Sequence, residues 1–275
     1  MGDGRPACAD VVIVAHDSGG LLADAAASAL EQAGLGHVWV MDAESTDGSV
    51  DRLEGEASGI HIVAVPNSGF AASNNRGIEA TTSPFVLLLN PDAVLRRGAL
   101  KALLSTAEAN PRAGIVGALV LNADGSVQSG SFGRFPTLAT SLALRLWRAA
   151  QRLRGNTGLS PKAPVATAPV DWVTGAALLV RRAALEDVGP MDEGFFLYFE
   201  DTEWCHRMHD HGWDVLLEPG ARVVHHRGGS STPKTVVASA YRASFYRYCD
   251  LHGLWGLKTS ARVGLCLRRL VGGAS

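Results

Sequence analysis

Several features that mark secreted, membrane-spanning or nucleic-acid-binding proteins are missing from this 275-residue chain. Its four cysteines show no CxxC spacing, so we expect free thiols in a reducing compartment and no disulfide framework. No apolar run approaches the roughly 20 residues that cross a bilayer, and the N-terminus lacks the basic and apolar segments of a secretory signal. These absences predict a cytoplasmic protein, with any membrane contact peripheral and on the inner face of the plasma membrane.

The net charge is also small, because 25 Lys and Arg nearly balance 27 Asp and Glu. Without a basic surface, nucleic acid is not a predicted partner. The balance nevertheless conceals a division along the chain. Residues 1–136 carry 8 basic and 15 acidic side chains, residues 137–275 carry 17 and 12, and residues 221–275 carry 9 and 1. The basic C-terminal end therefore needs an explanation of its own.

The composition is that of a folded protein, since hydrophobic residues make up 47% of it and can form a core. In the first half, short β-rich runs alternate with turn residues and helical patterns. The runs are VVIVA, HVWVMD, IHIVAV and PFVLLLN, at residues 11–15, 37–42, 60–65 and 84–90. This alternation predicts an α/β fold with a mostly parallel central sheet and helices on both faces.

The second half is less regular. One strand each is predicted over residues 114–122 and 170–182, a helix over 200–212, and one or two helices over 241–270. A further helix is predicted over 137–154, where arginines share one face. Two interpretations of this face, Arg145–Arg154, stay open: a solvated surface, or a contact with anionic lipid headgroups.

Ligands of parallel α/β sheets bind beyond the carboxyl ends of the strands. Asp17, Asp42, Asn67 and Asp92 all fall at or just after such ends. A carboxylate at Asp42 could accept the imide N–H of uracil or thymine, or N1–H of guanine, which adenine and cytosine lack. The alternative is an ordinary turn or helix-cap aspartate in the following ESTDGS segment.

Two further segments have the character of binding loops. In NSGFAASNNRGI, Gly69 and Gly77 allow the backbone to approach a ligand closely, although the Lys-Ser/Thr ending of a phosphate loop is missing. In LLLNPDA, Asp92 directly follows an apolar strand, where a carboxylate can hold a hard cation against a diphosphate. An Asn-Pro-Asp turn without a ligand is the alternative.

The segment FFLYFEDTEWCHR places Glu200, Asp201 and Glu203 at the start of a predicted helix. Acidic side chains there favour the helix dipole, or they supply a general base beside a cation site. The later segment VVHHRGGSS offers His225 as a nitrogen ligand. His226 is an equal candidate, because the sequence leaves the strand register open by one residue.

Taken together, these segments resemble the family 2 inverting glycosyltransferases of GT-A fold, particularly the rhamnosyltransferase-like branch. The resemblance runs in order from about Val11 to Ser231 and also includes IVGALVLNADGSVQSGSFGRFPT and DWVTGAALLVRR. It implies a transferase domain over residues 1–231, followed by a basic helical extension over residues 232–275. Within the domain, residues 10–120 would form the nucleotide-sugar-binding half and residues 121–231 the acceptor half.

The resemblance implies a role for each matching residue. Asp42 would recognise the base, and Asp17 lies in the first nucleotide-binding loop. Asp92 matches the metal-binding Asp of the DxD motif, with Asn90 in place of its first Asp. His225 matches the histidine that closes the metal and diphosphate site. The metal would be Mg²⁺ or Mn²⁺.

On the acceptor side, Asp201 matches the catalytic base, and Trp172 and Gly175 would line the sugar pocket. The remaining expected nucleotide-sugar-binding residues are Asn67, Asn75 and Glu200. Three positions depart from the family's usual pattern: Asp17 stands for an Asn, Glu203 stands for an Asp, and the frequent Asn after the base-reading aspartate is absent.

The implied reaction is the inverting transfer of a sugar from a nucleotide donor to a glycan or lipid-linked acceptor. A dTDP sugar, with L-rhamnose or another deoxyhexose, is the first expectation, and a UDP or GDP hexose is the alternative. A non-catalytic module that binds nucleotide sugars or carbohydrates on the same fold is the competing class. A dinucleotide-dependent oxidoreductase is rejected, since AHDSGG stands where GxGxxG would be required.

Three other patterns are interpreted as structural. His206, His209 and His211 lack the ligand spacing of a zinc site. Ser28 and Ser73 lie in no GxSxG elbow. The series Tyr241, Phe245 and Tyr248 is typical of the core-facing stripe of a helix.

Overall fold

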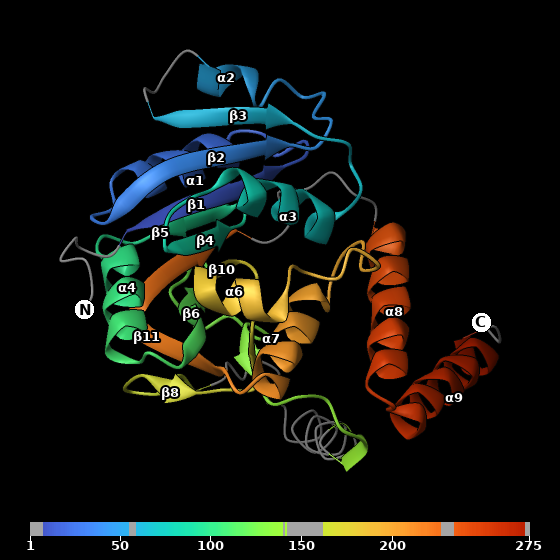
Figure 1. Cartoon of the computed structure of the whole chain (residues 1–275). Helices are drawn as coiled ribbons and strands as arrows, with labels where there is room; N and C mark the ends of the chain where they lie inside the picture. The colour runs from blue at the N-terminus through green and yellow to red at the C-terminus, as the bar shows by residue number, and fades with distance from the viewer. Residues whose placement is uncertain (1–7, 55–58, 140, 142–161, 227–233, 273–275) are drawn as a thin grey trace.

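A computed structural model describes residues 8–54, 59–139, 141, 162–226 and 234–272 (Figure 1). Its centre is a nine-stranded sheet. The strands are β1 (Ala9–Ala15), β2 (Leu35–Asp42), β3 (Ile60–Ala64), β4 (Phe85–Leu89), β5 (Ala93–Leu95), β6 (Ala113–Leu121), β8 (Ala168–Pro169), β10 (Ala177–Arg181) and β11 (Asp214–His225). Their order in space is β3-β2-β1-β4-β10-β6-β11-β5, and β8 pairs with β11.

Most strands of the sheet run in one direction. The pairs β1–β2, β2–β3, β1–β4 and β6–β11 are parallel, while β10 lies antiparallel between β4 and β6. The short strands β5 and β8 are antiparallel to β11. The predicted α/β class with a mostly parallel sheet is therefore confirmed.

Helices cover both faces of this sheet and close a separate core on each (Figure 1). The first core contains α1 (Leu21–Leu30) and α4 (Ala99–Ala109). The second core contains α3 (Phe70–Ala80), α6 (Arg182–Val188) and α7 (Glu200–Asp210). The short helix α2 (Asp51–Glu54) follows the turn after β2. Consecutive apolar residues in β1 and β4 are buried because the sheet is covered on both sides.

Two predictions about strands are corrected. Residues 170–182 do not form one strand, because a turn at Thr174–Ala176 separates β9 (Trp172–Val173) from β10. The strand β9 pairs instead with β7 (Phe132–Gly133) in a small second sheet. The sequence analysis also missed β5, whose three residues are too few to show a periodic pattern.

The C-terminal region forms two helices, α8 (Lys234–Leu251) and α9 (Trp255–Gly272). Helix α8 stands beside α7 and the loop that precedes it, and α9 continues away from the sheet (Figure 1). Among the described helices, none combines the length and the apolar character that crossing a membrane requires. The predicted arginine face, Arg145–Arg154, lies outside the described residues.

Candidate functional site

A cluster of three side chains lies where β4 and β11 end at the same edge of the sheet. His225 Nε2 is 2.9 Å from Asp92 Oδ1 and 3.2 Å from Asn90 Nδ2. The side chains of Asp92 and His225 are 17% and 12% exposed, so they are enclosed yet still reachable from solvent. Asn90 Oδ1 is buried and has no hydrogen-bond partner among the described residues.

Strand pairing decides which histidine joins this cluster. The antiparallel register between β5 and β11 places His225 opposite Ala93, and the His226 N–H donates to the Asp92 carbonyl at 2.8 Å. Neighbouring residues of a strand point to opposite faces. Accordingly His225 faces Asp92, whereas the His226 side chain is exposed.

Gln128 orients His225, and the sequence analysis did not single it out. Its Oε1 lies 2.8 Å from His225 Nδ1, and its Nε2 donates to Asn122 Oδ1 at 3.1 Å and to the His225 carbonyl at 3.2 Å. Because the amide nitrogen is committed to two acceptors, Oε1 faces the ring and Nδ1 must carry the proton. In the tautomer that carries a proton on Nδ1 alone, the lone pair lies on Nε2, toward Asp92.

Asp201 is held at the first turn of α7 by four donors. Its Oδ2 accepts the Gly175 N–H at 2.9 Å, and its Oδ1 accepts the N–H and hydroxyl of Thr202 at 2.6 and 3.1 Å; the hydroxyl of Thr174 also contributes. Burial raises the pKa of Asp201 above its usual value, and these hydrogen bonds oppose the rise. The residue is only half-buried, so a substrate can reach it.

Glu200, the neighbour of Asp201 in sequence, is deeply buried. It is 4% exposed, and its Oε2 has no hydrogen-bond partner among the described residues. Burial, followed by the charge of Asp201, raises the pKa of Glu200 well above the ordinary value. The negative charge of the pair is therefore favoured on Asp201 rather than on Glu200.

The turn Thr174–Ala176 joins the Asp92 cluster to Asp201. The Ala176 carbonyl accepts the N–H of Asn90 at 3.0 Å, while the adjacent Gly175 donates to Asp201. A Cβ atom at Gly175 would lie 3.1 Å from the ring of Phe70, the first residue of α3. Two adjacent backbone groups thus connect Asn90, two residues before Asp92, with Asp201.

At the neighbouring strand ends, Asp17 and Asp42 organise one turn. Asp42 Oδ1 accepts the Ser45 N–H at 3.0 Å, and Asp17 Oδ1 accepts the Thr46 N–H at 2.8 Å. Asp17 has a positive φ of 46°, which asparagine and aspartate tolerate better than most residues. Both acids lie at the predicted edge, and both have a turn-stabilising role there.

Three other predicted binding residues make contacts within the protein. Asn75 is buried, and its amide both donates to the Met191 carbonyl at 2.9 Å and accepts the Met191 N–H at 3.0 Å. These contacts make it a support for the loop before α7. Asn67 lies 3.4 Å from a ring nitrogen of His16. Trp172 donates its indole N–H to the Arg134 carbonyl at 3.1 Å.

The patterns that the sequence indicated to be structural do have structural roles. His206 stacks on His252 at 3.8 Å, His209 lies 3.0 Å from the Asp171 carbonyl, and His211 lies 3.5 Å from Asp187, so the three histidines do not converge. Tyr248 is fully buried, as its helical stripe predicted, although Tyr241 is 52% exposed.

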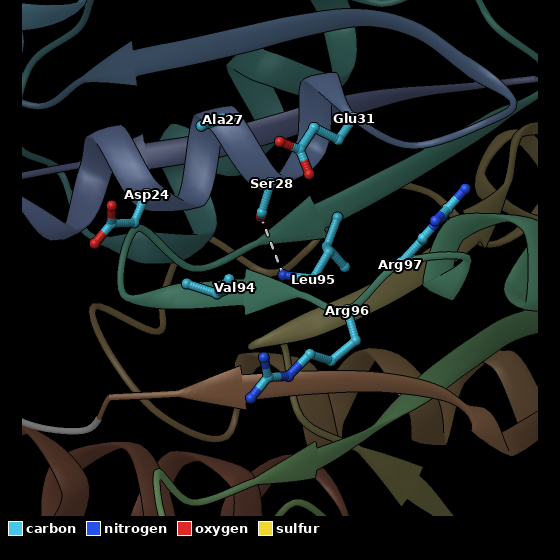
Figure 2. A pocket seen from close by; sticks show the side chains of 8 residues that line it. All are labelled: Asp24, Ala27, Ser28, Glu31, Val94, Leu95, Arg96 and Arg97. Carbon is cyan, nitrogen blue, oxygen red and sulfur yellow. Dashed lines mark hydrogen bonds between the residues drawn. The ribbon is translucent and has the colours of Figure 1, made fainter.

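Ser28 lines an open hollow between α1 and β5, where its hydroxyl accepts the Leu95 N–H at 3.0 Å (Figure 2). Two acids and two arginines also border the hollow, and none of the residues of the Asp92 and Asp201 clusters does. The hollow is therefore separate from the candidate site.

Comparison with known protein families identifies the one to which the chain belongs. The profile described as glycosyl transferase family 2 matches residues 10–168, which is more than half of the chain. The chain belongs to glycosyl transferase family 2.

Curated relatives of this family 2 member include rhamnosyltransferases. It is 29% identical over 256 residues to an N-acetylglucosaminyl-diphospho-decaprenol L-rhamnosyltransferase of Mycobacterium tuberculosis, covering 84% of this chain and 81% of that protein. It is 24% identical to the rhamnosyltransferase WbbL of Escherichia coli, covering 62% of this chain and 65% of that protein. The rhamnosyltransferase-like resemblance is confirmed.

A solved structure with the same fold is that of GalNAc-T7 with UDP, GalNAc and Mn²⁺. Its TM-score is 0.65 at 14% identity over 90% of this chain, which spans about half the length of the GalNAc-T7 chain. The likeness confirms the GT-A fold.

The Asp92 cluster of this family 2 protein fits a divalent cation. Two neighbouring ligands of an octahedral ion with bonds of about 2.1 Å lie about 3 Å apart, and His225 Nε2 and Asp92 Oδ1 are 2.9 Å apart. Asn90 Oδ1, which has no hydrogen-bond partner among the described residues, is available as a further oxygen ligand. Among the described residues, no group of three or more His, Cys, Asp and Glu side chains could hold a metal. A cation here would therefore need oxygens from a bound diphosphate or water.

Proposed function

We propose that this family 2 protein transfers L-rhamnose or another deoxyhexose from a dTDP sugar to a lipid-linked or glycan acceptor, with inversion at the anomeric carbon. The observation that carries the proposal is the turn Thr174–Ala176, which ties Asn90 of the Asp92–His225 cluster and Asp201 to adjacent backbone groups. Sugar transfer needs a binding site for the diphosphate and, close to it, a base for the acceptor hydroxyl.

Asp201 is the general base of the proposed reaction. It accepts the proton of the acceptor hydroxyl while that oxygen attacks the anomeric carbon from the face opposite the diphosphate, and the bond to the diphosphate breaks. The raised pKa of Asp201 makes it a stronger base than an exposed aspartate. The hydrogen bond from Gly175 keeps the carboxylate in one orientation.

Asp92 and His225 hold the donor end of the site, with Gln128 keeping the His225 lone pair toward Asp92. A Mg²⁺ or Mn²⁺ ion bound there supplies positive charge for the diphosphate as it leaves. At the nucleotide end, Asp42 Oδ1 accepts the Ser45 N–H. The other oxygen of Asp42 is the proposed acceptor for the imide N–H of thymine or uracil. The names of the rhamnosyltransferase relatives favour L-rhamnose as the transferred sugar.

The alternative class is a binding module that retains the fold without turnover. Asp201 argues against it, since a protein that only binds a nucleotide sugar has no use for a half-buried carboxylate with a raised pKa. Incubation with a panel of nucleotide sugars and Mn²⁺ distinguishes the two classes. Donor-dependent transfer or hydrolysis supports an enzyme, and stabilisation by a donor without turnover supports the module.

The substitution Asp201→Asn tests the base directly. The amide keeps the shape of the side chain but cannot accept the proton, so we expect transfer to fall by about 10²–10⁴-fold with the donor dissociation constant nearly unchanged. Asp24→Asn is the control, because Asp24 is exposed on α1 and belongs to neither the Asp92 cluster nor the Asp201 cluster. Near-normal transfer by Asp201→Asn would remove Asp201 from the base role.

A further inference from the structure

The loop of residues 192–199, which leads into Glu200 and Asp201, makes several contacts with side chains of α8. Arg247 of α8 makes a forked ion pair with Asp192, with nitrogen–oxygen distances of 2.7 to 3.1 Å, and its guanidinium lies 5.3 Å from the centre of the Phe195 ring. The Ser244 hydroxyl donates to the Leu197 carbonyl at 2.8 Å. Helix α8 therefore contacts the loop at its beginning, middle and end.

The end of this loop has an unfavourable backbone. Tyr198 and Phe199 have φ angles of 71° and 67°, a left-handed conformation that is sterically unfavourable for an aromatic residue. Packing against aromatic rings of α8 offsets this strain at Phe199. The centre of the Phe199 ring lies 5.2 Å from that of Tyr241 and 5.5 Å from those of Phe245 and Tyr248. The packing of α8 thus stabilises a conformation that the loop alone disfavours.

The same loop reaches the groups that hold Asp201 from the other side. The Phe196 carbonyl accepts the Phe70 N–H at 2.8 Å, and a Cβ atom at Gly69 would lie 2.6 Å from that carbonyl. Phe70 in turn packs against Gly175, the donor to Asp201. A shift of the loop would therefore move Asp201 and its donor together.

We propose that α8 is a positioning element for the catalytic base, acting through the 192–199 loop by the Arg247–Asp192 pair, the Ser244–Leu197 hydrogen bond and the aromatic cage around Phe199. This inference rests on the proposed role of Asp201. It assigns part of the basic C-terminal extension a role in catalysis, without contact between α8 and the reacting atoms.

Two matched variants test the proposal. Asp192→Asn weakens the ion pair that joins the loop to α8, and Asp250→Asn weakens the Asp250–Lys258 pair, which lies within the extension and does not touch the loop. For Asp192→Asn we expect kcat to fall by roughly tenfold or more, because misplacing a catalytic group by about 1 Å can cost 10²-fold. The donor dissociation constant should stay within about twofold, and Asp250→Asn should match the wild type.

Two further measurements separate positioning from a general loss of structure. Loosening the loop admits water to Asp201 and lowers its raised pKa, so the acid limb of the kcat profile should move to lower pH in Asp192→Asn. Arg247→Lys keeps the positive charge but cannot form the two-pronged pair with Asp192. Its kcat should therefore lie between those of the wild type and Arg247→Ala. Identical kcat and pH profiles in Asp192→Asn and Asp250→Asn would overturn the proposal.

Hydrogen exchange gives a result that does not depend on turnover. Amides of residues 200–203 and the Gly175 N–H should exchange faster in Arg247→Ala than in Asp250→Asn, because the loop that precedes α7 loses its ion pair with α8. If the wild type transfers no sugar, the proposed function fails while this exchange difference can still be measured. Equal exchange in the two variants contradicts the positioning role itself.

Discussion

At the residue scale, the orientation of His225 depends on one side chain. Gln128 fixes the proton on Nδ1 because its own amide nitrogen is committed to Asn122 and to the His225 carbonyl. Histidine ligands to metals generally depend on such a partner for their ring orientation. Gln128 lies within the NADGSVQSG segment, just after Val127 bridges back to Leu121.

We therefore expect Gln128→Leu to weaken Mn²⁺ binding, measured in the presence of dTDP by isothermal titration, by about 10- to 100-fold. Asp124→Asn is the control and should retain the affinity, since exposed Asp124 lies in the same segment and contacts Ser126 rather than His225. Thermal unfolding of both variants reports whether the fold is intact. An unchanged affinity in Gln128→Leu would exclude the orienting role.

At the element scale, helix α3 lies against the sheet because one of its residues has no side chain. The sequence analysis interpreted Gly77 as a point of close approach to a ligand, but a Cβ atom there would lie 2.3 Å from Val12 of β1 and 3.1 Å from Met41 of β2. The close approach is between a helix and two strands. Gly69, at the start of α3, does have a positive φ of 101° and adjoins the 192–199 loop.

Replacement of Gly77 by alanine should consequently lower the free energy of unfolding by about 1–3 kcal/mol, the usual cost of adding volume to a packed core. Urea denaturation measures this change. Gly20→Ala is the control, because a Cβ atom at Gly20 meets nothing within 4 Å and its φ of −73° suits any residue. Equal stability of the two variants would contradict the packing role of Gly77.

At the scale of the whole molecule, two histidines form a contact between the C-terminal helices and α7. His252, just after α8, stacks on His206 of α7 at 3.8 Å, and burial lowers the pKa of His252 to about 4. Burial also lowers the pKa of His206. The nearby charged side chains are Asp210 and Arg207, which favour and disfavour a protonated His252 respectively.

A histidine whose pKa is lower in the folded state binds its proton more readily once unfolded. The stability that it contributes is complete above its unfolded pKa near 6.5 and is lost as the pH falls toward 4. We expect the free energy of unfolding to drop more between pH 7 and pH 5 for the wild type than for His252→Phe, measured by urea denaturation. The same drop in both proteins would show that this stack does not sense pH.

Part of the basic excess of the extension is used inside the protein. Arg247 pairs with Asp192, Lys258 pairs with Asp250, and Arg262 lies 5.2 Å from the centre of the Tyr246 ring. The charge that remains is the basis for a membrane proposal, in which the extension meets anionic headgroups near a lipid-linked acceptor. Helix α9 carries two adjacent arginines, Arg268 and Arg269.

We expect the protein to sediment with vesicles that contain anionic phosphatidylglycerol, to bind neutral phosphatidylcholine vesicles weakly, and to lose binding at high salt. The double variant R268E/R269E should bind the anionic vesicles less. No preference for anionic vesicles would leave the remaining charge of the extension as a solvated surface.

The sequence by itself determined the fold class, because the alternation of apolar runs and helical patterns is local and continuous along the chain. It also located Asp92 and Asp201, since each directly follows or begins a clear element. Tertiary structure alone decided between His225 and His226, because the register of β11 on β5 depends on pairing between segments far apart in sequence.

Three other features could not be predicted from the sequence for the same reason: the role of Gln128, the turn that joins Asn90 to Asp201, and the contact of α8 with the 192–199 loop. Each depends on side chains or backbone groups that come together only when the sheet closes. No periodicity within one segment encodes such a contact. The division of charge along the chain was visible in the sequence, but only the folded chain shows which of the C-terminal basic side chains are bound within it.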